Sequence, residues 1–326
     1  MDTPTQPTPD ETALATTSAD EAVSLVPSPP GALTSVATAG VTIVIPAYNE
    51  ENGVAPVLGE MLEMLEVHLA GLDWEVIVVN DGSKDKTAEA IAPYVGGRLS
   101  LVSHPKNRGY GAALKTGIKH ARFEWILITD ADGTYPAEFI PEILRHRDLH
   151  EMVVGARVGE KAAIPLIRRP PKWVLRKLAS VLSRQDIPDL NSGLRVMRRD
   201  LCQRFENILP NGFSFTTTIT LAMFSAGYHV KYVPINYLKR EGKSKIRPIA
   251  DTLGFLTLIV RTIMYFDPLR VFLPVSLAFL VSSALVGAIS FALGQLMDVT
   301  TVVLFVTGVH LMALGMLADT LNRRFQ

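Results

Sequence analysis

Short unbroken runs of Val, Ile and Leu alternate with amphipathic stretches from residue 41 onward, and this alternation constrains the fold more than any other feature. VTIVIPA, WEVIVVN, LSLVS and WILIT each have the length of a strand, and the stretches between them have the spacing of surface helices. Strands that are apolar along their whole length are buried on both faces, which requires a parallel sheet covered by helices. The sequence therefore predicts an α/β fold with a mostly parallel sheet, continued by another strand at 151–159.

A polar cluster follows the end of each of the first four predicted strands. The clusters lie at 49–50, 80–83, 107–109 and 130–132. In parallel α/β sheets, ligands bind outside the carboxyl ends of the strands, where loops that are distant in sequence meet. We therefore expect these clusters to line one cleft.

The fourth cluster contains Asp130 and Asp132, directly after the apolar run FEWILIT. Side chains alternate sides in extended backbone, so both carboxylates are expected to point the same way. Paired carboxylates form a hard oxygen site for Mg²⁺ or Mn²⁺, and such a cation would neutralise a bound diphosphate. A lone Asp-x-Asp can also be a solvated acidic turn, but the preceding strand and the neighbouring clusters favour the metal site.

Two apolar segments near the C-terminus indicate a membrane anchor. Residues 271–293 and about 299–320 are each close to the roughly 20 residues that a helix needs to cross the hydrocarbon layer. The connector between them has no Lys or Arg, whereas arginines flank the outer ends: Arg261, Arg270, Arg323 and Arg324. By the positive-inside rule, this pattern predicts an integral membrane hairpin, with both termini and the α/β domain in the cytoplasm. The alternative is a pair of buried core helices in a soluble domain.

The rest of the chain divides around these features. Residues 1–38 are rich in Thr, Pro, Ser and Ala and have no Lys or Arg, which predicts a disordered tail rather than a targeting peptide. We expect an α/β domain at 39–245, a juxtamembrane amphipathic helix at 246–268 and the transmembrane hairpin at 269–326. Another basic amphipathic helix is predicted at 168–185, either at an anionic membrane surface or on the surface of the domain.

Further features concern redox state and partners. Cys202 is the single cysteine, which excludes an internal disulfide and fits a reducing compartment, and we expect it to be a buried small hydrophobe. The small residues Ser282, Ser283, Ala284 and Gly287 in the first apolar segment would allow homo-oligomers to form within a bilayer. The formal net charge of zero gives no indication of a nucleic-acid partner.

Five motifs, in order, give the sequence a family resemblance. They are IPAYNEE at 45–51, VVNDGSKDKT at 78–87, NRGYGAAL at 107–114, DADGTYP at 130–136 and NSGLR at 191–195. With these motifs the chain resembles the family 2 glycosyltransferases, and more narrowly their polyprenyl-phosphate branch, typified by dolichol-phosphate mannose synthase. The resemblance covers about residues 41–250. It implies a GT-A (Rossmann-like) domain that transfers a sugar from a nucleotide diphosphate to a lipid phosphate.

The resemblance assigns residues to the nucleotide pocket. Pro46, Tyr48 and Glu50 would line this pocket, and the Asp81 carboxylate would accept a hydrogen bond from the base. On local grounds alone, Asp81 could instead form an Asx turn before a helix that begins near Lys84. The GxG of NRGYGAAL could approach a phosphate at a helix N-terminus, although tight packing of the helix explains it better.

The metal site implied by the resemblance adds a third residue to the two aspartates. Asp132 would be the principal metal ligand and a catalytic residue, and Asp130 would support the metal or contact the ribose. Relatives often read DADLQ-P, with a Gln near the metal. Thr134 stands at that position here and would offer its hydroxyl oxygen, directly or through water.

Basic residues would surround the phosphates. Arg240, Lys243 and Ser244 match a loop by which relatives hold phosphates, although a basic loop before a membrane helix could also bind lipid headgroups. Arg157 and Arg195 match arginines around the acceptor phosphate, for which the planar guanidinium is suited.

Asp189 has two readings. It could act as the general base, or it could orient Arg195 or the acceptor loop. A lipid monophosphate has a second pKa of about 6 and is already largely anionic at neutral pH, so a base is nearly dispensable. No histidine lies in a matching motif, and none is assigned a chemical role.

The function expected from these residues is that of a membrane-bound inverting glycosyltransferase with a nucleotide-sugar donor and a dolichyl or undecaprenyl phosphate acceptor. One alternative is a polysaccharide synthase of the same superfamily, although the sequence has no Q-x-x-R-W motif. The other is a non-catalytic membrane protein that binds a nucleotide sugar.

Overall fold

The computed structural model describes residues 38–157, 180, 186–238, 257, 259–294 and 299–325. Its strands are β1 (Thr38–Ala47), β2 (Trp74–Asn80), β3 (Leu99–Ser103), β4 (Phe123–Ile128), β5 (Met152–Ala156), β6 (Arg195–Arg198) and β7 (Val230–Pro234). The helices of the α/β domain are α1 (Val54–His68), α2 (Thr87–Ile91), α3 (Tyr110–His120), α4 (Ile140–Arg145), α6 (Arg199–Arg204) and α7 (Phe215–Ser225). Short 3-10 helices occupy Ala92–Tyr94, Ala137–Phe139 and Arg147–Leu149. Two long helices follow, α9 (Leu269–Ala292) and α10 (Val299–Phe325).

Within the described residues, seven strands form one sheet in the order β3-β2-β1-β4-β6-β5-β7. Neighbouring strands are parallel except in the two pairs that involve β6. Because β6 runs against β4 and β5, its first residue, Arg195, lies opposite Ile128 at the end of β4. The prediction of a mostly parallel α/β sheet is confirmed.

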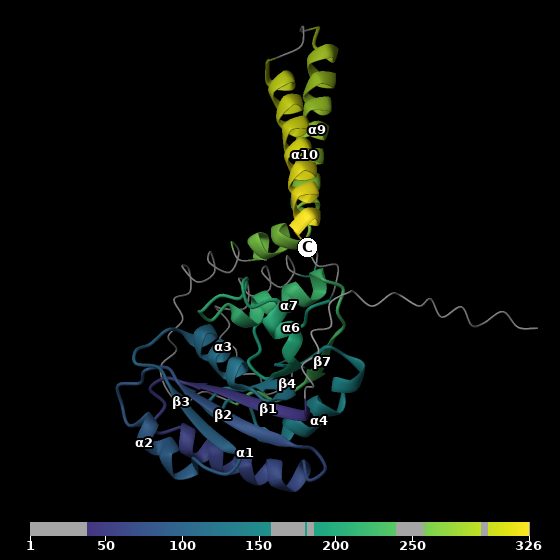
Figure 1. Cartoon of the computed structure of the whole chain (residues 1–326). Helices are drawn as coiled ribbons and strands as arrows, with labels where there is room; N and C mark the ends of the chain where they lie inside the picture. Colours follow the sequence, from purple (N-terminus) through teal and green to yellow (C-terminus); the bar gives the residue numbers. More distant parts are fainter. Residues whose placement is uncertain are drawn as a thin grey trace, which may run out of the picture. The chain divides into compact units, whose positions relative to one another are not determined.

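Helices cover both faces of this sheet (Figure 1). Ile43 and Ile45 of β1 pack with Leu58 of α1 on one face, whereas Val44 packs with Leu114 of α3 on the other. Burial on both faces explains why β1 is apolar at successive positions rather than at alternate ones. Cys202 of α6 is buried, as predicted.

The sheet is less predictable after β4. The predicted strand at 151–159 is observed as β5, but β6 and β7 have no counterpart in the sequence-based prediction. β6 is RVMR, with a charged residue at each end, and β7 is VKYVP, with a charged residue and a proline. Neither resembles the long apolar runs that identify β1, β2 and β4.

Residues 259–266 are helical and pack against the α/β domain. Ile259 and Ile263 are buried in a cluster with Leu221 of α7, and the Phe266 ring lies edge-on to Phe205, with ring centroids 5.9 Å apart. This part of the predicted juxtamembrane helix therefore buries apolar side chains against protein.

The predicted division of the chain is only partly covered by the structure. The tail up to residue 37 and most of the predicted helix at 168–185 lie outside the described residues, as do 246–256. β1 begins at Thr38, the last residue assigned to the tail, and α9 begins at Leu269, where the hairpin is predicted to start. The domain boundaries themselves stay a prediction.

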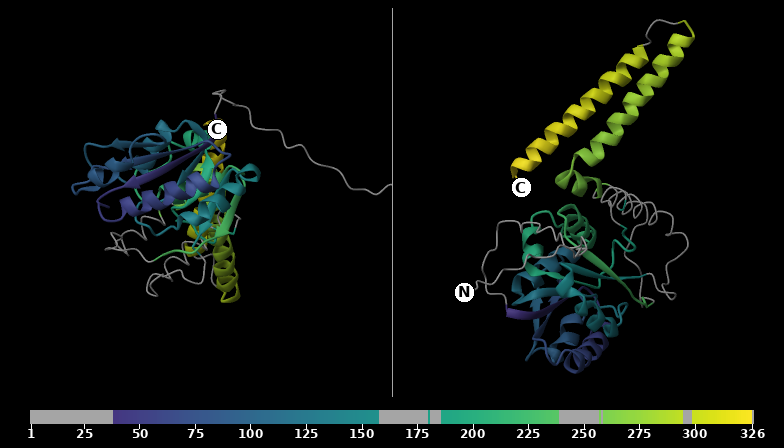
Figure 2. Two further views of the ribbon diagram at one scale, coloured as in Figure 1. Left: turned by 90° about the horizontal axis from the view of Figure 1, so that it is seen from below. Right: turned by 90° about the vertical axis from the view of Figure 1, so that its right-hand side faces the viewer.

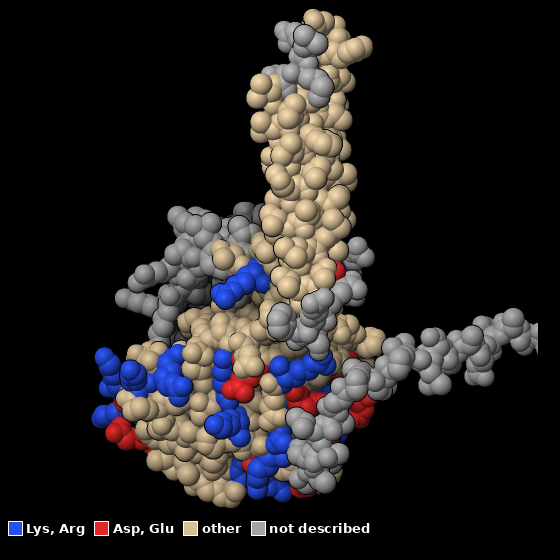
Figure 3. Space-filling model, turned by 45° about the horizontal axis from the view of Figure 1, so that its top comes forward, with Lys and Arg blue, Asp and Glu red and all other residues tan. Residues whose placement is uncertain are grey.

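Helices α9 and α10 lie side by side as a hairpin (Figures 1 and 2). Both are long and apolar enough to cross a membrane, with mean hydropathies of 2.2 and 2.0. Only 11% and 17% of these apolar stretches are buried, and Figure 3 shows the hairpin free of charged side chains over most of its length. Core helices of a soluble domain would be mostly buried, so the exposure favours the predicted membrane hairpin over the alternative.

A seam of small residues joins the two helices. Ser276, Ser283 and Ser290 are spaced by seven, which places them on one side of α9, and all three are buried. The hydroxyl of Ser276 donates to the carbonyl oxygen of Gly308 at 2.8 Å, and that of Ser283 donates to Thr301 at the same distance. These bonds hold α9 and α10 together.

The seam alters the expectation of self-association. Ser283 is buried in the hairpin, and a Cβ added at Gly287 would lie 3.2 Å from Thr301 Cγ2. Two of the four small residues predicted to promote self-association therefore serve contacts within the chain. Ser282 and Ala284 remain exposed, and the oligomeric state stays a prediction.

Replacing Gly315 with Val is expected to loosen the hairpin. A Cβ at this position would lie 2.6 Å from Phe272 Cβ, which is too close to the α9 backbone to move aside. Overpacking of this kind costs about 1–3 kcal/mol. Hydrogen–deuterium exchange in detergent micelles should show faster exchange along α9 and α10, whereas Ala284→Val on the exposed side should not change it. Equal protection in both variants would contradict the packing described here.

Candidate active site

The sheet brings the predicted polar clusters to one edge. β1 to β5 and β7 all end at this edge, and β6 begins there. The strand ends and loops at this edge carry most of the residues expected to form the site: Pro46, Tyr48, Glu50, Asp81, Asp130, Asp132, Thr134, Arg157, Asp189 and Arg195. The remaining three, Arg240, Lys243 and Ser244, lie outside the described residues.

The loops after β1 and β2 are joined by hydrogen bonds. The Asn49 backbone N–H donates to Ser83 Oγ at 3.0 Å, and the Lys84 N–H donates to Asn49 Oδ1 at 2.9 Å. The Glu50 N–H donates to Thr87 Oγ1 at 2.9 Å. The motifs IPAYNEE and NDGSKDKT therefore form one unit. This unit leaves Pro46, Tyr48 and Glu50 partly exposed at its rim, where their nucleotide contacts stay a prediction.

The two aspartates after β4 are each held by a hydroxyl group. Asp130 Oδ1 accepts a hydrogen bond from the Tyr110 hydroxyl at 3.0 Å. Asp132 Oδ1 accepts one from the Thr134 hydroxyl at 2.6 Å and another from the Thr134 backbone N–H at 3.2 Å. Thr134 is fully buried behind Asp132. Its position suits a residue that orients a metal ligand better than the ligand predicted from the sequence.

The carboxylates fit a divalent cation that is shared with a substrate. Their oxygens are hard donors of the type that Mg²⁺ and Mn²⁺ prefer. Among the described residues, no three His, Cys, Asp or Glu side chains gather in one potential metal site. A cation at Asp130 and Asp132 would therefore take its remaining ligands from diphosphate oxygens and water, as Mg²⁺ commonly does in enzymes that bind nucleotides.

Asp81 anchors a neighbouring loop. Its carboxylate is 3% exposed and accepts hydrogen bonds from the backbone N–H groups of Arg108 at 2.9 Å and Gly109 at 2.8 Å. His104 Nδ1 lies 2.7 Å from Asp81 Oδ1, and His104 Nε2 lies 2.9 Å from Thr116 Oγ1 on α3. The expected contact with a base stays a prediction.

The sequence analysis assigned no role to His104, which the structure places in the hydrogen-bond network of Asp81. It lies in no motif, and the bonds that give it a role reach from the end of β3 to residues before and after it in the chain. A buried histidine with both ring nitrogens in hydrogen bonds is recognisable only once the loops are placed. No simple sequence signal identifies it.

The glycines at the start of α3 serve packing. A Cβ at Gly109 would lie 2.5 Å from the Asn211 carbonyl oxygen, and one at Gly111 would lie 2.1 Å from that of Pro210. The Ala112 N–H donates to the Asn211 carbonyl at 3.1 Å, so protein already occupies this helix terminus. The packing interpretation of the GxG is the one that the structure supports.

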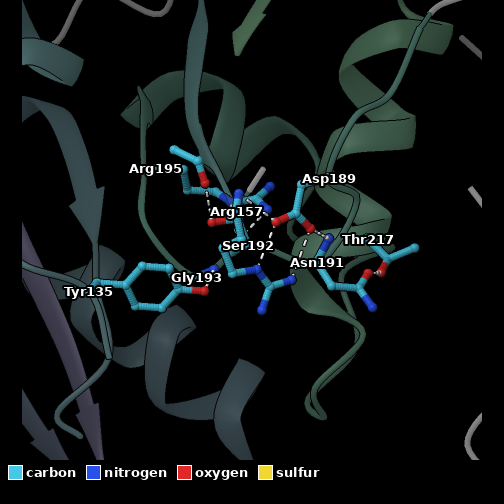
Figure 4. Close-up of polar contacts among 9 residues, drawn as sticks. Tyr135, Arg157, Asp189, Asn191, Ser192, Gly193, Arg195 and Thr217 are labelled. Carbon is cyan, nitrogen blue, oxygen red and sulfur yellow. Dashed lines mark hydrogen bonds and ion pairs between the residues drawn. The ribbon is translucent and has the colours of Figure 1, made fainter. Parts of the chain in front are cut away.

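Arg157 and Asp189 form a bidentate ion pair (Figure 4). Arg157 Nε donates to Asp189 Oδ2 at 2.7 Å, and Nη2 donates to Oδ1 at 2.9 Å. Burial alone would raise the pKa of Asp189, but Arg157 and the backbone N–H of Asn191 hold this pKa below its ordinary value. Both carboxylate oxygens of Asp189 are engaged by Arg157, which favours the orienting role over that of a base. The arginine that Asp189 contacts is Arg157 rather than Arg195.

Arg195 lies behind the site. Its side chain is 0% exposed, and its guanidinium donates to the Ser192 carbonyl at 2.5 Å and to Thr220 Oγ1 at 2.8 Å. It also donates to the Thr216 carbonyl at 3.1 Å, so it ties the loop before β6 to α7. The sequence-based prediction placed Arg195 at the acceptor phosphate, whereas the structure places it where it supports that loop.

The segment that leads to the predicted phosphate loop is hydrogen-bonded to the loop that carries Asp130 and Asp132. The Leu238 N–H donates to the Thr134 carbonyl at 3.0 Å. The Tyr237 ring lies edge-on to Tyr135, with centroids 5.2 Å apart, and the Arg157 guanidinium lies 5.2 Å from the Tyr237 ring centroid. The chain therefore leaves the described region beside the two aspartates.

Two family models match the sequence. The model of glycosyl transferase family 2 matches residues 42–205, and the model of the GtrB C-terminal hairpin matches residues 267–323. The first spans the α/β domain from β1 to the loop after α6. The second spans α9 and most of α10, which supports their assignment as membrane helices.

Curated relatives agree with these matches. The chain is 31% identical over 241 residues to a dolichyl-phosphate beta-glucosyltransferase of Trichomonas vaginalis, covering 69% of this chain and 71% of the relative. It is 32% identical over 210 residues to a dolichyl-phosphate hexose transferase of Haloferax volcanii, covering 64% of this chain and 87% of the relative.

Solved structures share the fold. The glucosyl-3-phosphoglycerate synthase of Mycobacterium tuberculosis, solved with Mn²⁺, uridine diphosphate and phosphoglyceric acid, superimposes with a TM-score of 0.54 at 18% identity. The match covers 69% of this chain and 79% of the synthase. The same synthase with Mg²⁺ and uridine diphosphate gives a TM-score of 0.52 at 20% identity.

Proposed function

The chain belongs to glycosyl transferase family 2, and on this premise we propose that it transfers a hexose from a nucleoside-diphosphate sugar to the phosphate of a polyprenyl lipid. The observation that carries the proposal is the combination of the two-aspartate loop with a membrane hairpin in one chain. Relatives that are named dolichyl-phosphate transferases support the lipid acceptor.

The reaction follows from the groups at the site. An acceptor phosphate oxygen forms a bond to the anomeric carbon of the sugar, while the bond from that carbon to the donor diphosphate breaks. The nucleoside diphosphate leaves with the electron pair, and attack from the opposite face inverts the anomeric centre. A divalent cation bound at Asp130 and Asp132 would neutralise charge on the leaving diphosphate.

Little proton transfer is required of the protein. The second pKa of a lipid monophosphate is about 6, so the nucleophile arrives already ionised at neutral pH. Arg157, oriented by Asp189, is the residue that we assign to the acceptor phosphate, because a guanidinium donates to phosphate oxygens with fixed geometry. Positioning and charge neutralisation would then supply most of the rate acceleration.

The membrane orientation belongs to the same proposal. Arg261 and Arg270 precede α9, or lie at its start, and Arg270 Nε pairs with Asp267 at 2.6 Å. The arginines at the other end of the hairpin, Arg323 and Arg324, lie near the C-terminus of α10. Cationic side chains at both outer ends favour a cytoplasmic location for the α/β domain and both termini.

Transfer of labelled sugar from a nucleotide donor to an organic-extractable lipid tests the proposal directly. Purified protein in detergent, given Mn²⁺ or Mg²⁺, should label dolichyl or undecaprenyl phosphate from at least one donor in a panel that begins with UDP-glucose and includes GDP-mannose. Omitting the lipid phosphate or chelating the metal should remove the product. Donor binding without transfer to any lipid phosphate would favour the non-catalytic alternative.

A further inference from the structure

The Asp130 carboxylate is confined by residues from two distant segments. The Tyr110 hydroxyl, at the first position of α3, donates to Asp130 Oδ1 at 3.0 Å. The Gly193 backbone also lies against this carboxylate, since a Cβ added there would be 2.9 Å from Oδ2 and 3.0 Å from Oδ1. The Gly193 N–H donates to the Tyr135 hydroxyl at 2.6 Å, which keeps Gly193 in place (Figure 4).

We propose that Tyr110 is a positioning residue, whose hydroxyl fixes the orientation in which Asp130 meets the metal-bound diphosphate of the donor. The inference rests on the proposed function, because it concerns the same site. It assigns a role to the tyrosine of the NRGYGAAL motif, of which the sequence analysis considered only the glycines.

The two aspartates receive hydroxyl groups from different parts of the chain. Asp132 is held by Thr134, two residues further along the same loop. The hydroxyl that reaches Asp130 comes from α3, so the orientation of Asp130 is tied to the position of that helix.

Tyr110 is itself well fixed. The backbone just before it is clamped by Asp81, which accepts hydrogen bonds from the N–H groups of Arg108 and Gly109. Its ring stacks on Phe213, with centroids 5.6 Å apart and an angle of 21° between the planes. Because the Tyr110 side chain is held in place by these contacts, its hydroxyl can restrict the orientation of the Asp130 carboxylate.

Tyr110→Phe tests the proposal, since it removes the hydroxyl and keeps the ring that stacks on Phe213. The test measures binding of Mn²⁺ in the presence of uridine diphosphate or guanosine diphosphate. The loss of the electron paramagnetic resonance signal of free Mn²⁺ reports this binding and requires no turnover. Hydrogen bonds to charged groups are strong enough that we expect Mn²⁺ affinity to fall about tenfold or more. Tyr94→Phe, in the 3-10 helix Ala92–Tyr94, is the matched control and should bind as the unaltered protein does.

The kinetic readout separates positioning from general damage. The metal concentration for half-maximal transfer should rise in Tyr110→Phe, while the KM for lipid phosphate stays within about twofold of the unaltered value. Unchanged Mn²⁺ affinity, or an equal rise in the KM for lipid phosphate, would overturn the proposal. Unaltered protein that binds Mn²⁺ and nucleotide but labels no lipid would instead contradict the proposed function and leave the binding test of Tyr110 intact.

Discussion

Replacing Asp132 with Asn is expected to lower sugar transfer by about a thousandfold or more. The substitution keeps the size of the side chain and an oxygen that can accept from Thr134, which donates to Asp132 at 2.6 Å. It removes the negative charge that would bind the cation. Loss of a single group that stabilises transition-state charge typically costs two to three orders of magnitude, roughly 10²–10³, and loss of a metal ligand weakens metal binding as well.

Labelling of organic-extractable lipid, measured over a range of Mn²⁺ concentrations, provides the check. Asp148→Asn is a suitable control, because Asp148 is an acidic surface residue with a side chain that is 75% exposed. Thermal unfolding of both variants should match that of the unaltered protein. Transfer by Asp132→Asn at an unaltered rate, with metal present, would remove Asp132 from the site.

Replacing Asp189 with Ala is expected to destabilise the α/β domain by about 3–5 kcal/mol, because it leaves the guanidinium of Arg157 buried without its partner. The two side chains are only 15% and 11% exposed, so solvent cannot replace the lost bonds. Unfolding in detergent micelles measures this change. Asp148→Ala, which breaks an exposed pair with Arg147, should cost about 1 kcal/mol or less. A cost for Asp189→Ala no larger than that would show that the pair contributes little.

The pH dependence of this stabilisation has a definite sign. The pKa of Asp189 is lower in the folded protein than in the unfolded chain, where it is about 3.9. Its contribution is therefore complete above that value and is lost as the pH falls through the lower, folded-state pKa. The stability difference between the unaltered protein and Asp189→Asn should be constant near neutrality and narrow below about pH 4. A difference that stays constant through the acid range would contradict the pairing.

The same pair determines how acceptor kinetics should respond. If Asp189 orients Arg157, then Arg157→Ala and Asp189→Asn should both raise the KM for lipid phosphate more than the KM for the nucleotide sugar. If Asp189 were instead the base, Asp189→Asn would mainly lower kcat, and Arg157→Ala would not reproduce its effect.

The first half of the sheet could be predicted from sequence because its signal is local. β1, β2 and β4 are buried on both faces, so their residues are apolar without interruption, and the loops that follow them reach one edge by topology alone. The two aspartates are recognisable for the same reason, since they directly follow such a strand. The hairpin is recognisable from its length and apolar composition.

What could not be predicted depends on contacts between distant residues. Arg195 looks like a phosphate ligand by its residue type, but pairing of β6 with β4 turns its side chain into the protein. Thr134 replaces a glutamine of relatives, yet it donates to Asp132 instead of facing a metal. His104 and Tyr110 gain their roles from Asp81 and Asp130, which lie 23 and 20 residues away in the chain. Composition and spacing carry no record of such pairings.

The reversed direction of β6 has a consequence for how such enzymes diversify. Because β6 runs against β5, β5 ends and β6 begins at the same edge of the sheet, where the two aspartates also lie. A connection between two strand ends at one edge can vary in length without shifting the register of either strand. If, as we propose, the loops after β1, β2 and β4 bind the donor, that binding can be inherited unchanged while the connection between β5 and β6 changes with the acceptor.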